Sequence, residues 1–370
     1  TVTVLVIACP HALGLAIPLV VSIATERAAR AGVLVKDRLA LESMRTIGAV
    51  LFDKTGTLTT GAPTVLDVAP AEGHDADEVL ALAASAEGDS EHPLARAIVR
   101  AANERELSVA HASNFRSEAA LGVTATVDGR TVRVGGPRLL DEVGGEPLAD
   151  TSAWSDEGAI VLHVIVDGEV AGALKLADEI RAESREAVDA VRALGVQVVM
   201  ITGDAEAVAH AVADELGIDR VFAGVRPEDK AAKVSELQKE GLSVAMVGDG
   251  VNDAPALAQA DVGIAIGAGT DVAIGSAGVI LASSDPRSVL SVIRLSRASY
   301  RKMQQNLWWA AGYNLAAVPL AAGVLAFIGF ILPMSIGAIL MSLSTIVVAL
   351  NAQLLRRLDL RPEASIEALS

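Results

Sequence analysis

Two long stretches without a charged residue constrain this chain most. Residues 1–25 contain no Asp, Glu, Lys or Arg and are rich in Val, Leu, Ile and Ala, and residues 303–353 are equally free of charge. A helix needs about 20 apolar residues to cross a bilayer. We therefore predict one transmembrane helix over residues 1–25 and two more over residues 303–329 and 332–355, with the turn between them at residues 330–333.

Basic residues border all three predicted spans. They follow the first span, precede the second and follow the third: Arg27, Arg30, Lys36 and Arg38; Arg297, Arg301 and Lys302; Arg356 and Arg357. Because Lys and Arg gather on cytoplasmic flanks, the sequence predicts an integral membrane protein with a large cytoplasmic loop between the first two spans and a cytoplasmic tail over residues 356–370. A secretory signal peptide is the alternative for residues 1–25. The apolar run is too long for one, has no basic start and contains Cys-Pro-His.

Charge and cysteine content exclude two further classes of protein. The net charge of −16 suits an acidic soluble domain and argues against a nucleic-acid partner. A single cysteine excludes a disulfide framework. Since the chain begins at Thr1, inside an apolar run and without an initiator Met, we expect it to lack an N-terminal part.

The cytoplasmic loop alternates short apolar runs with amphipathic patterns. Strands are predicted at residues 49–52, 196–201, 242–247 and 262–266, and helices at residues 180–193, 205–216, 229–239 and 254–260. Such alternation is typical of a doubly wound parallel sheet, which binds ligands at the carboxyl ends of its strands. Residues 63–172 interrupt it with predicted helices at 76–86 and 94–106 and hairpins around Asp128-Gly129 and Asp167-Gly168. We interpret this block as an α+β domain inserted into the α/β domain.

Asp53-Lys-Thr-Gly-Thr-Leu-Thr59 is the most specific motif in the chain. An Asp at a strand end, followed by small and hydroxyl residues, places a carboxylate nucleophile beside backbone N–H groups that can hold a phosphoryl group. A polar turn after a strand is the plainer interpretation. The motifs at the other strand ends count against it.

Those strand ends supply the groups that phosphoryl transfer needs. Thr202 in Thr-Gly-Asp204 offers a hydroxyl, and Lys230 offers a fixed positive charge. Asp249 and Asp253 lie four residues apart on one strand-to-helix turn. Two hard oxygen ligands beside a phosphate suit a partly hydrated Mg²⁺.

Cys9-Pro10-His11 lies inside the first predicted span. A proline there opens the helix by freeing a carbonyl group, and polar groups at membrane depth are candidate functional residues. A thiolate next to an imidazole suits a soft or borderline metal such as copper. A proline kink with incidental neighbours is the alternative.

Together these motifs resemble the signature set of P-type ATPases, within the haloacid dehalogenase-like superfamily. The resemblance covers essentially the whole chain, and Cys-Pro-His resembles the subgroup of copper and silver exporters that carries this motif. It implies that Asp53 is phosphorylated from ATP and that the Thr55 carbonyl joins Asp53, Asp249 and Asp253 around Mg²⁺. The expected catalytic residues are Asp53, Lys54, Thr55, Thr202, Gly203, Asp204, Lys230 and Asn252.

The inserted block contains Ser90-Glu91-His92-Pro-Leu94, which resembles the element of heavy-metal-transporting members whose His orients adenine. The resemblance implies an ATP site at Glu87, Glu91, His92, Gly122 and Gly135. Two departures affect the details: Ala120 replaces the first glycine of the family's nucleotide loop, and Gly136 stands where Asn is common.

The later spans carry polar and thioether positions similar to those of copper-type pumps. With Cys9 and His11, the resemblance implies cargo ligands at Asn314, Met341 and Ser344; ordinary packing is the alternative for Met341. Neither span contains Asp, Glu or Lys, whereas the family resemblance implies a charged pair there in zinc, cadmium and lead pumps. A zinc, cadmium or cobalt pump is the alternative. A soluble phosphatase of the same superfamily would lack the spans, the insert and Cys-Pro-His.

The predicted organisation follows from both lines of argument. We expect a first span (residues 1–25), a linker with the start of the phosphorylation domain (26–62), a nucleotide-binding domain (63–172), the rest of the phosphorylation domain (173–296), two spans and the tail. The family resemblance implies export of copper or silver across a bilayer, taken to be a bacterial plasma membrane. It also implies that the remainder of the pump, with its actuator domain and earlier spans, is needed to complete the cycle.

Overall fold

The computed structural model describes residues 4, 11–118, 121–267, 271–330 and 332–368, so Cys9 and Ala120 lie outside the described residues. The chain divides into two compact units. The first comprises Thr1–Leu51, Glu186–Val198 and Glu228–Ser370, and the second comprises Phe52–Arg185 and Val199–Pro227.

A seven-stranded sheet has the strand order β1-β13-β12-β11-β2-β9-β10. Its strands are β1 (Val33–Val35), β2 (Ala49–Asp53), β9 (Gln197–Ile201), β10 (Arg220–Phe222), β11 (Val244–Gly248), β12 (Val262–Ile266) and β13 (Val279–Leu281). The pairs β9–β10, β11–β12 and β12–β13 are parallel, whereas β1 pairs antiparallel with β13 at one edge. Every residue of β2, β11 and β12 is buried, as expected for strands covered on both faces.

The predicted strands correspond to β2, β9, β11 and β12, each displaced by no more than two residues at either end. The predicted helices that follow correspond to α9 (Ser184–Ala193), α10 (Glu206–Leu216), α11 (Lys230–Lys239) and α12 (Ala254–Gln259). The α/β fold class is therefore confirmed. The sequence analysis did not predict β1, β10 and β13, which have three residues each and are too short for a periodic pattern.

A six-stranded sheet in the second unit has the order β3-β8-β7-β6-β5-β4. Its strands are β3 (Thr59–Pro70), β4 (Ser113–Glu118), β5 (Gly122–Val127), β6 (Arg130–Gly135), β7 (Ile160–Val166) and β8 (Glu169–Ile180), and the pairs between neighbours are antiparallel. Both predicted hairpins are confirmed. Asp128 and Asp167 have positive φ angles and precede Gly129 and Gly168, which also do, as two-residue hairpin turns of this kind require.

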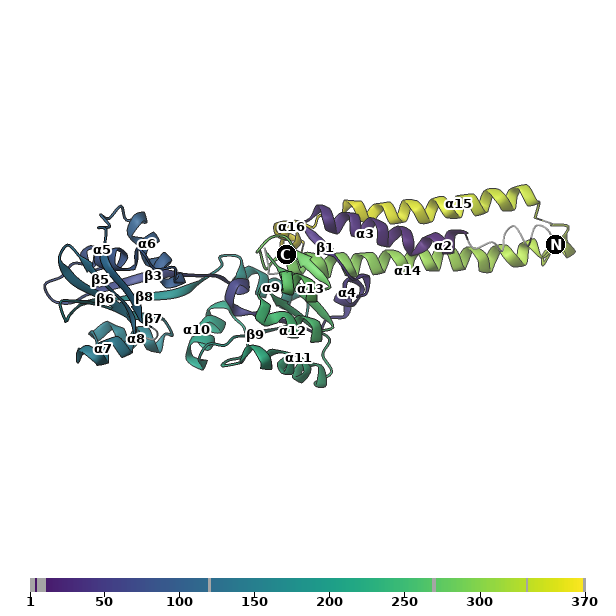
Figure 1. Cartoon of the computed structure of the whole chain (residues 1–370). Helices are drawn as coiled ribbons and strands as arrows, with labels where there is room; N and C mark the ends of the chain where they lie inside the picture. The colour runs from purple at the N-terminus through teal and green to yellow at the C-terminus, as the bar shows by residue number, and fades with distance from the viewer. Residues whose placement is uncertain (1–3, 5–10, 119–120, 268–270, 331, 369–370) are drawn as a thin grey trace. The chain divides into compact units, whose positions relative to one another are not determined.

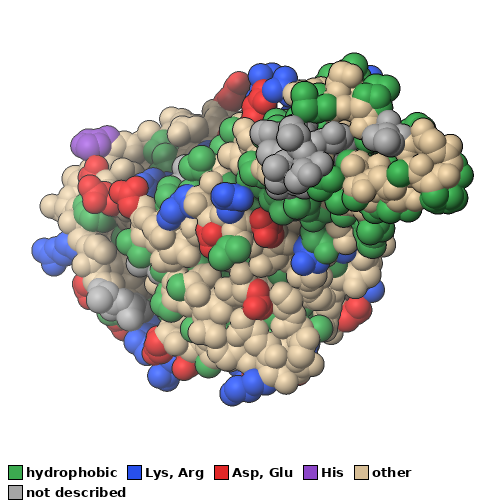
Figure 2. All heavy atoms as spheres, turned by 90° about the vertical axis from the view of Figure 1, so that its right-hand side faces the viewer, with side chains coloured by type: hydrophobic (Ala, Val, Ile, Leu, Met, Phe, Trp, Pro, Cys, Tyr) green, Lys and Arg blue, Asp and Glu red, His purple; other side chains and the backbone are tan. Residues whose placement is uncertain are grey.

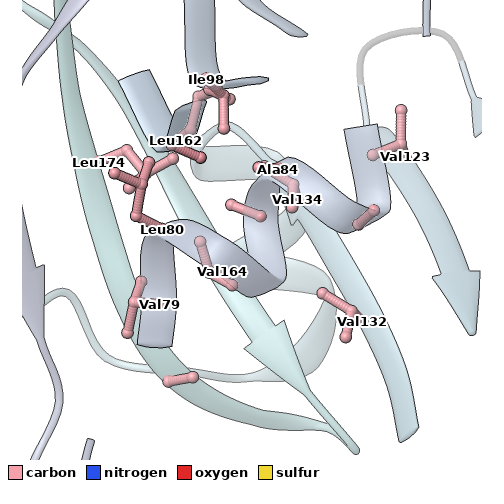
Figure 3. Close-up of a cluster of buried hydrophobic side chains, with 14 of the residues drawn as sticks. Val79, Leu80, Ala84, Ile98, Val123, Val132, Val134, Leu162, Val164 and Leu174 are labelled. Carbon is pink, nitrogen blue, oxygen red and sulfur yellow. The ribbon is translucent and has the colours of Figure 1, made fainter. Parts of the chain in front are cut away.

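Helices cover both faces of this sheet (Figure 1). Helices α5 (Ala76–Glu87) and α6 (Pro93–Glu104) lie on one face, and α7 (Pro137–Val143) and α8 (Ala149–Asp156) lie on the other. On the first face, Leu80 of α5 and Ile98 of α6 lie with Leu162 and Leu174 of the sheet in one buried cluster (Figure 3). The predicted α+β character of the insert is thus observed.

The inserted sheet extends beyond the predicted segment of residues 63–172. Strand β3 begins at Thr59 and β8 continues to Ile180, where the two strands pair with each other. Leu174 and Leu176 are fully buried in the core of the insert. Residues 173–180, which the sequence analysis assigned to the second part of the phosphorylation domain, therefore belong to this sheet.

The first unit also contains the helices at the two ends of the described chain. They are α2 (His11–Ala16), α3 (Pro18–Arg30), α14 (Ser288–Ala321) and α15 (Met334–Gln353). By length and composition, two of the described helical segments could cross a membrane, Ala12–Arg30 and Met334–Arg357. The helix of the second predicted span is α14, which starts well inside the polar part of the chain and ends at Ala321 rather than at residue 329.

Large hydrophobic side chains are exposed along these helices. Figure 2, which faces the right-hand end of these helices in Figure 1, shows hydrophobic side chains gathered there. The exposed residues include Trp308 and Leu315 of α14, Ile339 and Leu350 of α15, and Phe327 of the short helix Ala326–Ile328 between them. Because soluble proteins rarely expose contiguous apolar patches of this kind, the surface is compatible with a lipid environment.

Candidate functional site

Asp53 is the last residue of β2, and its side chain is buried. The loop that follows, Lys54–Leu58, turns at Gly56, whose φ of +75° is readily adopted by glycine. The Thr59 hydroxyl donates to the Lys54 carbonyl at 3.0 Å and closes the loop. The motif thus places a buried carboxylate at a strand end, while Thr55 is exposed.

Lys54 and the Thr-Gly-Asp motif form one hydrogen-bonded group. The Lys54 ammonium lies 2.5 Å from an Asp204 carboxylate oxygen. The Thr202 hydroxyl donates to the same carboxylate at 2.9 Å, and the Asp204 backbone N–H donates back to the Thr202 oxygen at 3.1 Å. Gly203, between them, is exposed. The structure therefore brings together Lys54, Thr202 and Asp204.

A second group lies at the end of β11. Lys230 donates to one oxygen of Asp253 at 2.7 Å, and both residues are buried. The other Asp253 oxygen accepts from the Gly250 backbone N–H at 3.2 Å. A methyl group on Gly248 would come within 2.6 Å of that oxygen, so the motif needs a glycine there. Asp249 is half-buried and Asn252 is exposed.

Asp53 ends β2, and Asp249 and Asp253 follow β11, so each offers a carboxylate oxygen at or after the end of a strand of the seven-stranded sheet. Hard, negatively charged oxygen donors are the ligands that Mg²⁺ prefers. The chemistry of this donor set therefore fits a magnesium ion.

Glu87 occupies an unusual position at the end of α5. Its side chain is buried, and one carboxylate oxygen has no hydrogen-bond partner among the described residues. Burial raises the pKa of Glu87 to about 7, against a smaller lowering by the hydrogen bond with Ser90. Glu87, Gly88 and Ser90 line a groove of about 470 Å³ together with residues of α6. An unpartnered carboxylate beside a groove can accept a hydrogen bond from a ligand.

Glu91 and His92 are exposed on the loop between α5 and α6. His92 is the N-cap of α6, where its Nδ1 atom accepts from the Leu94 backbone N–H at 3.3 Å. Its Nε2 atom is not used by that bond. The loop thus presents the imidazole on the surface of the insert, as a ligand-orienting role would require.

Gly122 and Gly135 have a packing reason to be glycine. A methyl group on Gly122 would come within 2.0 Å of the Val134 carbonyl oxygen, and one on Gly135 within 1.9 Å of the Leu121 carbonyl oxygen. The start of β5 and the end of β6 therefore touch through their backbones. The sequence analysis assigned both glycines to nucleotide binding alone and did not predict this close approach.

The candidate cargo ligands are only partly described. Cys9 lies outside the described residues, and His11 begins α2 with its side chain outside them. Asn314 of α14 and Met341 of α15 are half-buried. Ser344 of α15 and Tyr313 of α14 have buried hydroxyl oxygens without a hydrogen-bond partner among the described residues. Two uncompensated polar groups on neighbouring apolar helices are consistent with a ligand site there.

Sequence reasoning missed Asp178. This residue of β8 accepts hydrogen bonds from the Gly61 backbone N–H at 2.9 Å and from the Thr60 hydroxyl at 3.3 Å, and its carboxylate also contacts the Thr59 hydroxyl. It thereby holds the two strands that lead into and out of the insert. The only signal was an acidic residue directly after an apolar strand pattern, which is too common to be singled out.

Residues 47–261 match a family model described as haloacid dehalogenase-like hydrolase. This region contains Asp53 and the other two strand-end motifs.

Two curated relatives match nearly the whole chain. One, named copper-exporting P-type ATPase B, from Archaeoglobus fulgidus, is 52% identical over 96% of this chain and 51% of its own length. Another of the same name, from Enterococcus hirae, is 44% identical over 96% of this chain and 48% of its own length. The chain therefore spans about half the length of the curated relatives it matches.

Two solved structures of ATPases are similar to this chain. A zinc-transporting PIB-type ATPase in the E2.Pi state superposes with a TM-score of 0.84 at 36% identity, over 94% of this chain and 56% of the other. The catalytic domain of a CPx-ATPase called CopB-B superposes with a TM-score of 0.60 at 29% identity, over 73% of this chain and 98% of the other.

Proposed function

The chain belongs to the haloacid dehalogenase-like hydrolases, and on that premise we propose that it is the catalytic and cation-translocating part of a P-type ATPase that exports copper or silver across a membrane. It is similar over nearly its whole length to ATPases of this type. ATP hydrolysis through a phosphorylated Asp53 drives the transport. The half of the relatives' length that this chain does not span supplies the rest of the pump.

The observation that carries the proposal is the buried Asp53 at the end of β2. Lys54, which follows it, is bonded to the Thr-Gly-Asp motif at the end of β9. Lys54, Thr202 and Asp204 form one bonded group, and Asp204 neutralises the lysine. This arrangement holds the Thr202 hydroxyl and the Lys54 side chain in fixed positions. Fixed donors that need no reorganisation contribute most of the catalysis of phosphoryl transfer.

The chemical step uses Asp53 as a nucleophile. One carboxylate oxygen attacks the γ-phosphorus of ATP, the bond from that phosphorus to the β,γ-bridging oxygen breaks, and ADP leaves. The product on the chain is an acyl phosphate. Thr202 and Lys230 are proposed to stabilise the transferring phosphoryl oxygens. Asp253, which binds Lys230 at 2.7 Å, keeps that lysine in place.

The donor set of Asp53, Asp249 and Asp253 would hold Mg²⁺, with the Thr55 carbonyl as a further ligand and Asn252 in support. When bound, the ion would neutralise negative charge that accumulates on the phosphoryl group. The support for this site is the chemistry of the donors, three carboxylates that each lie at or after the end of a strand of the seven-stranded sheet.

ATP is proposed to bind in the insert at the groove beside Glu87. The buried, unpartnered oxygen of Glu87 would accept a hydrogen bond from the base, and His92 would stack on it or orient it. Glu91 lies next to His92 on the same exposed loop. Gly122 and Gly135, which keep the backbones of β5 and β6 close together, are proposed as further contacts of the nucleotide.

Copper or silver is the cargo that the membrane residues favour. Cys9 and Met341 offer sulfur, which prefers soft ions, and His11 offers imidazole. The chain has no Asp, Glu or Lys over residues 303–353, where a harder ion would need a charged ligand. The second candidate is a zinc pump, which the zinc-transporting structural neighbour favours. Asn314 and Ser344 would complete the site in either case.

Phosphorylation of the full-length pump tests the proposal. With radiolabelled ATP, Mg²⁺ and Cu⁺ or Ag⁺, the protein is expected to acquire an acid-stable, hydroxylamine-labile phosphate. Asp53→Asn should abolish the label because an amide cannot form an acyl phosphate. Asp128→Asn is the matched control, since Asn tolerates the left-handed conformation of this hairpin residue.

The outcomes separate the alternatives. Full labelling of Asp53→Asn would refute the assignment of the nucleophile. A soluble-type phosphatase would be labelled by a phosphate ester without any response to transition metals. Loss of label in the control as well would mean that the chain does not tolerate this substitution in general.

A further inference from the structure

A chain of hydrogen bonds crosses three helices of the first unit. Lys302 of α14 donates to Oδ1 of Asn351 on α15 at 2.9 Å. Asn351 donates through Nδ2 to Oδ1 of Asn306 at 2.8 Å, and Asn306 donates through Nδ2 to the carbonyl oxygen of Ala16 at 3.3 Å. Each donor points the same way, from the ammonium group to the backbone carbonyl. Bonds aligned in this manner polarise and strengthen one another.

The hydrogen bond between Asn306 and Ala16 lies in apolar surroundings. Asn306 is 1% exposed. Ala16, to which it donates, belongs with Ala12, Ala310 and Val348 to a buried hydrophobic cluster. Burying a side-chain amide costs free energy unless it is hydrogen-bonded, and an apolar residue of similar size would avoid that cost. Hydrophobic packing therefore does not explain why an amide side chain stands at Asn306.

Ala16 occupies a special place in its helix. It ends α2, and α3 begins at Pro18, so the helix is interrupted at Ile17. Pro18 has no N–H, so the carbonyl group four residues before it, that of Gly14, loses its helical donor close to Ala16. Asn306 supplies a donor at this interruption.

The interruption lies in the segment that carries the Cys-Pro-His motif. His11 is the first residue of α2, and Ala16 is its last. The helices that supply the hydrogen-bond chain, α14 and α15, are those that carry Asn314, Met341 and Ser344. One bonded chain therefore connects all three helices on which candidate cargo ligands lie.

We propose that Asn306, held by Asn351 and Lys302, is a positioning residue for cation transport. It fixes the interruption at Ile17 against α14 and α15, and through it the geometry of the cargo site. The inference rests on the proposed function. Because misplacing reacting or binding groups by about 1 Å can cost roughly a hundredfold, loss of this bond should weaken the response to the transported metal, although Asn306 is not one of the proposed ligands.

The test uses the full-length pump and two readouts. Asn306→Leu keeps the approximate shape of the side chain and deletes the amide. We expect the concentration of Cu⁺ or Ag⁺ that half-activates phosphorylation from ATP to rise by about tenfold or more. Phosphorylation of Asp53 by inorganic phosphate with Mg²⁺ but without Cu⁺ or Ag⁺, the reverse of hydrolysis, should persist.

Two further variants sharpen the test. Asn351→Leu breaks the same chain one step earlier, at a half-buried position, and should shift the metal response in the same direction. Combined with Asn306→Leu it should add little, because both changes break the same chain. Gln305→Leu removes an exposed amide from the neighbouring position and should leave the metal response within about twofold of the wild type.

Three results would overturn the positioning role. The first is a metal response of Asn306→Leu within about twofold of the wild type. The second is an equal loss of both phosphorylation reactions in the Asn306 and Asn351 variants, which would mark a general structural role. The third is full additivity of the two changes. If the wild type itself shows no metal-dependent phosphate on Asp53, the proposed function fails and this inference fails with it.

Discussion

The carbonyl oxygen of Leu121 leaves no space for a side chain at Gly135. A methyl group there would come within 1.9 Å of the Leu121 carbonyl oxygen, so Gly135→Ala must push β5 and β6 apart. We expect a loss of about 2–3 kcal/mol in the free energy of unfolding, together with weaker ATP binding. Urea unfolding and calorimetry check this in a soluble segment matched to that of the solved catalytic domain.

Gly136 provides the control for that prediction. It is the next residue, and a methyl group on it would meet nothing within 4 Å. Gly136→Ala should therefore change stability by less than about 0.5 kcal/mol. Equal effects of the two substitutions would contradict the packing explanation.

Glu87 predicts a specific pH dependence. Burial raises its pKa from 4.5 to about 7, so the folded state binds the proton more tightly than the unfolded chain does. Stability from this group is therefore present below pH 4.5 and is lost as the pH rises towards 7. Glu87→Gln should remove this dependence and stabilise the insert above pH 7 by up to about 3 kcal/mol. Unfolding curves of wild type and variant that stay parallel from pH 5 to 8 would refute it.

At the scale of elements, the pairing of β3 with β8 decides where the insert can be cut. Residues 63–172 would leave out Leu174 and Leu176, which are fully buried in its core. Each large residue removed from a core costs about 2–5 kcal/mol. We expect residues 59–180 to fold alone and bind ATP, and residues 63–172 to remain unfolded. Circular dichroism and calorimetry on the two segments distinguish them, and equal folding of both would contradict this boundary.

At the scale of the whole molecule, the prediction concerns the cargo. Cys9→Ala or His11→Ala should abolish metal-dependent phosphorylation without changing nucleotide binding, because the sulfur and imidazole donors are separate in sequence from the nucleotide-binding insert. Met341→Leu keeps volume and apolarity but deletes the sulfur, so it should weaken activation if Met341 is a ligand and cost little if it only packs.

Metal selectivity in the full-length pump decides between the two cargo candidates. We expect ATP turnover to respond to Cu⁺ or Ag⁺ and much less to Zn²⁺ or cobalt. Strong activation by zinc with copper inert would show that the membrane ligands have been misinterpreted.

The sequence by itself determined the features that depend on a few consecutive residues. Apolar runs of four to six residues marked β2, β9, β11 and β12, because strands buried on both faces must be continuously apolar. Asp-Gly pairs marked both hairpins, and the strand-end motifs marked the chemistry. Each of these signals is contained within a few neighbouring residues.

Only the tertiary structure decided the features that join distant residues. The continuation of β8 to Ile180 depends on β3, with which it pairs across more than a hundred residues of insert. Gly122 and Gly135 are required by the carbonyl groups of Val134 and Leu121. The bond from Asn306 to Ala16 joins residues 290 apart in the sequence. Hydropathy along the sequence predicts which residues are buried. The partner of a buried polar group depends on which helices pack together, and this packing is fixed only when the chain is folded.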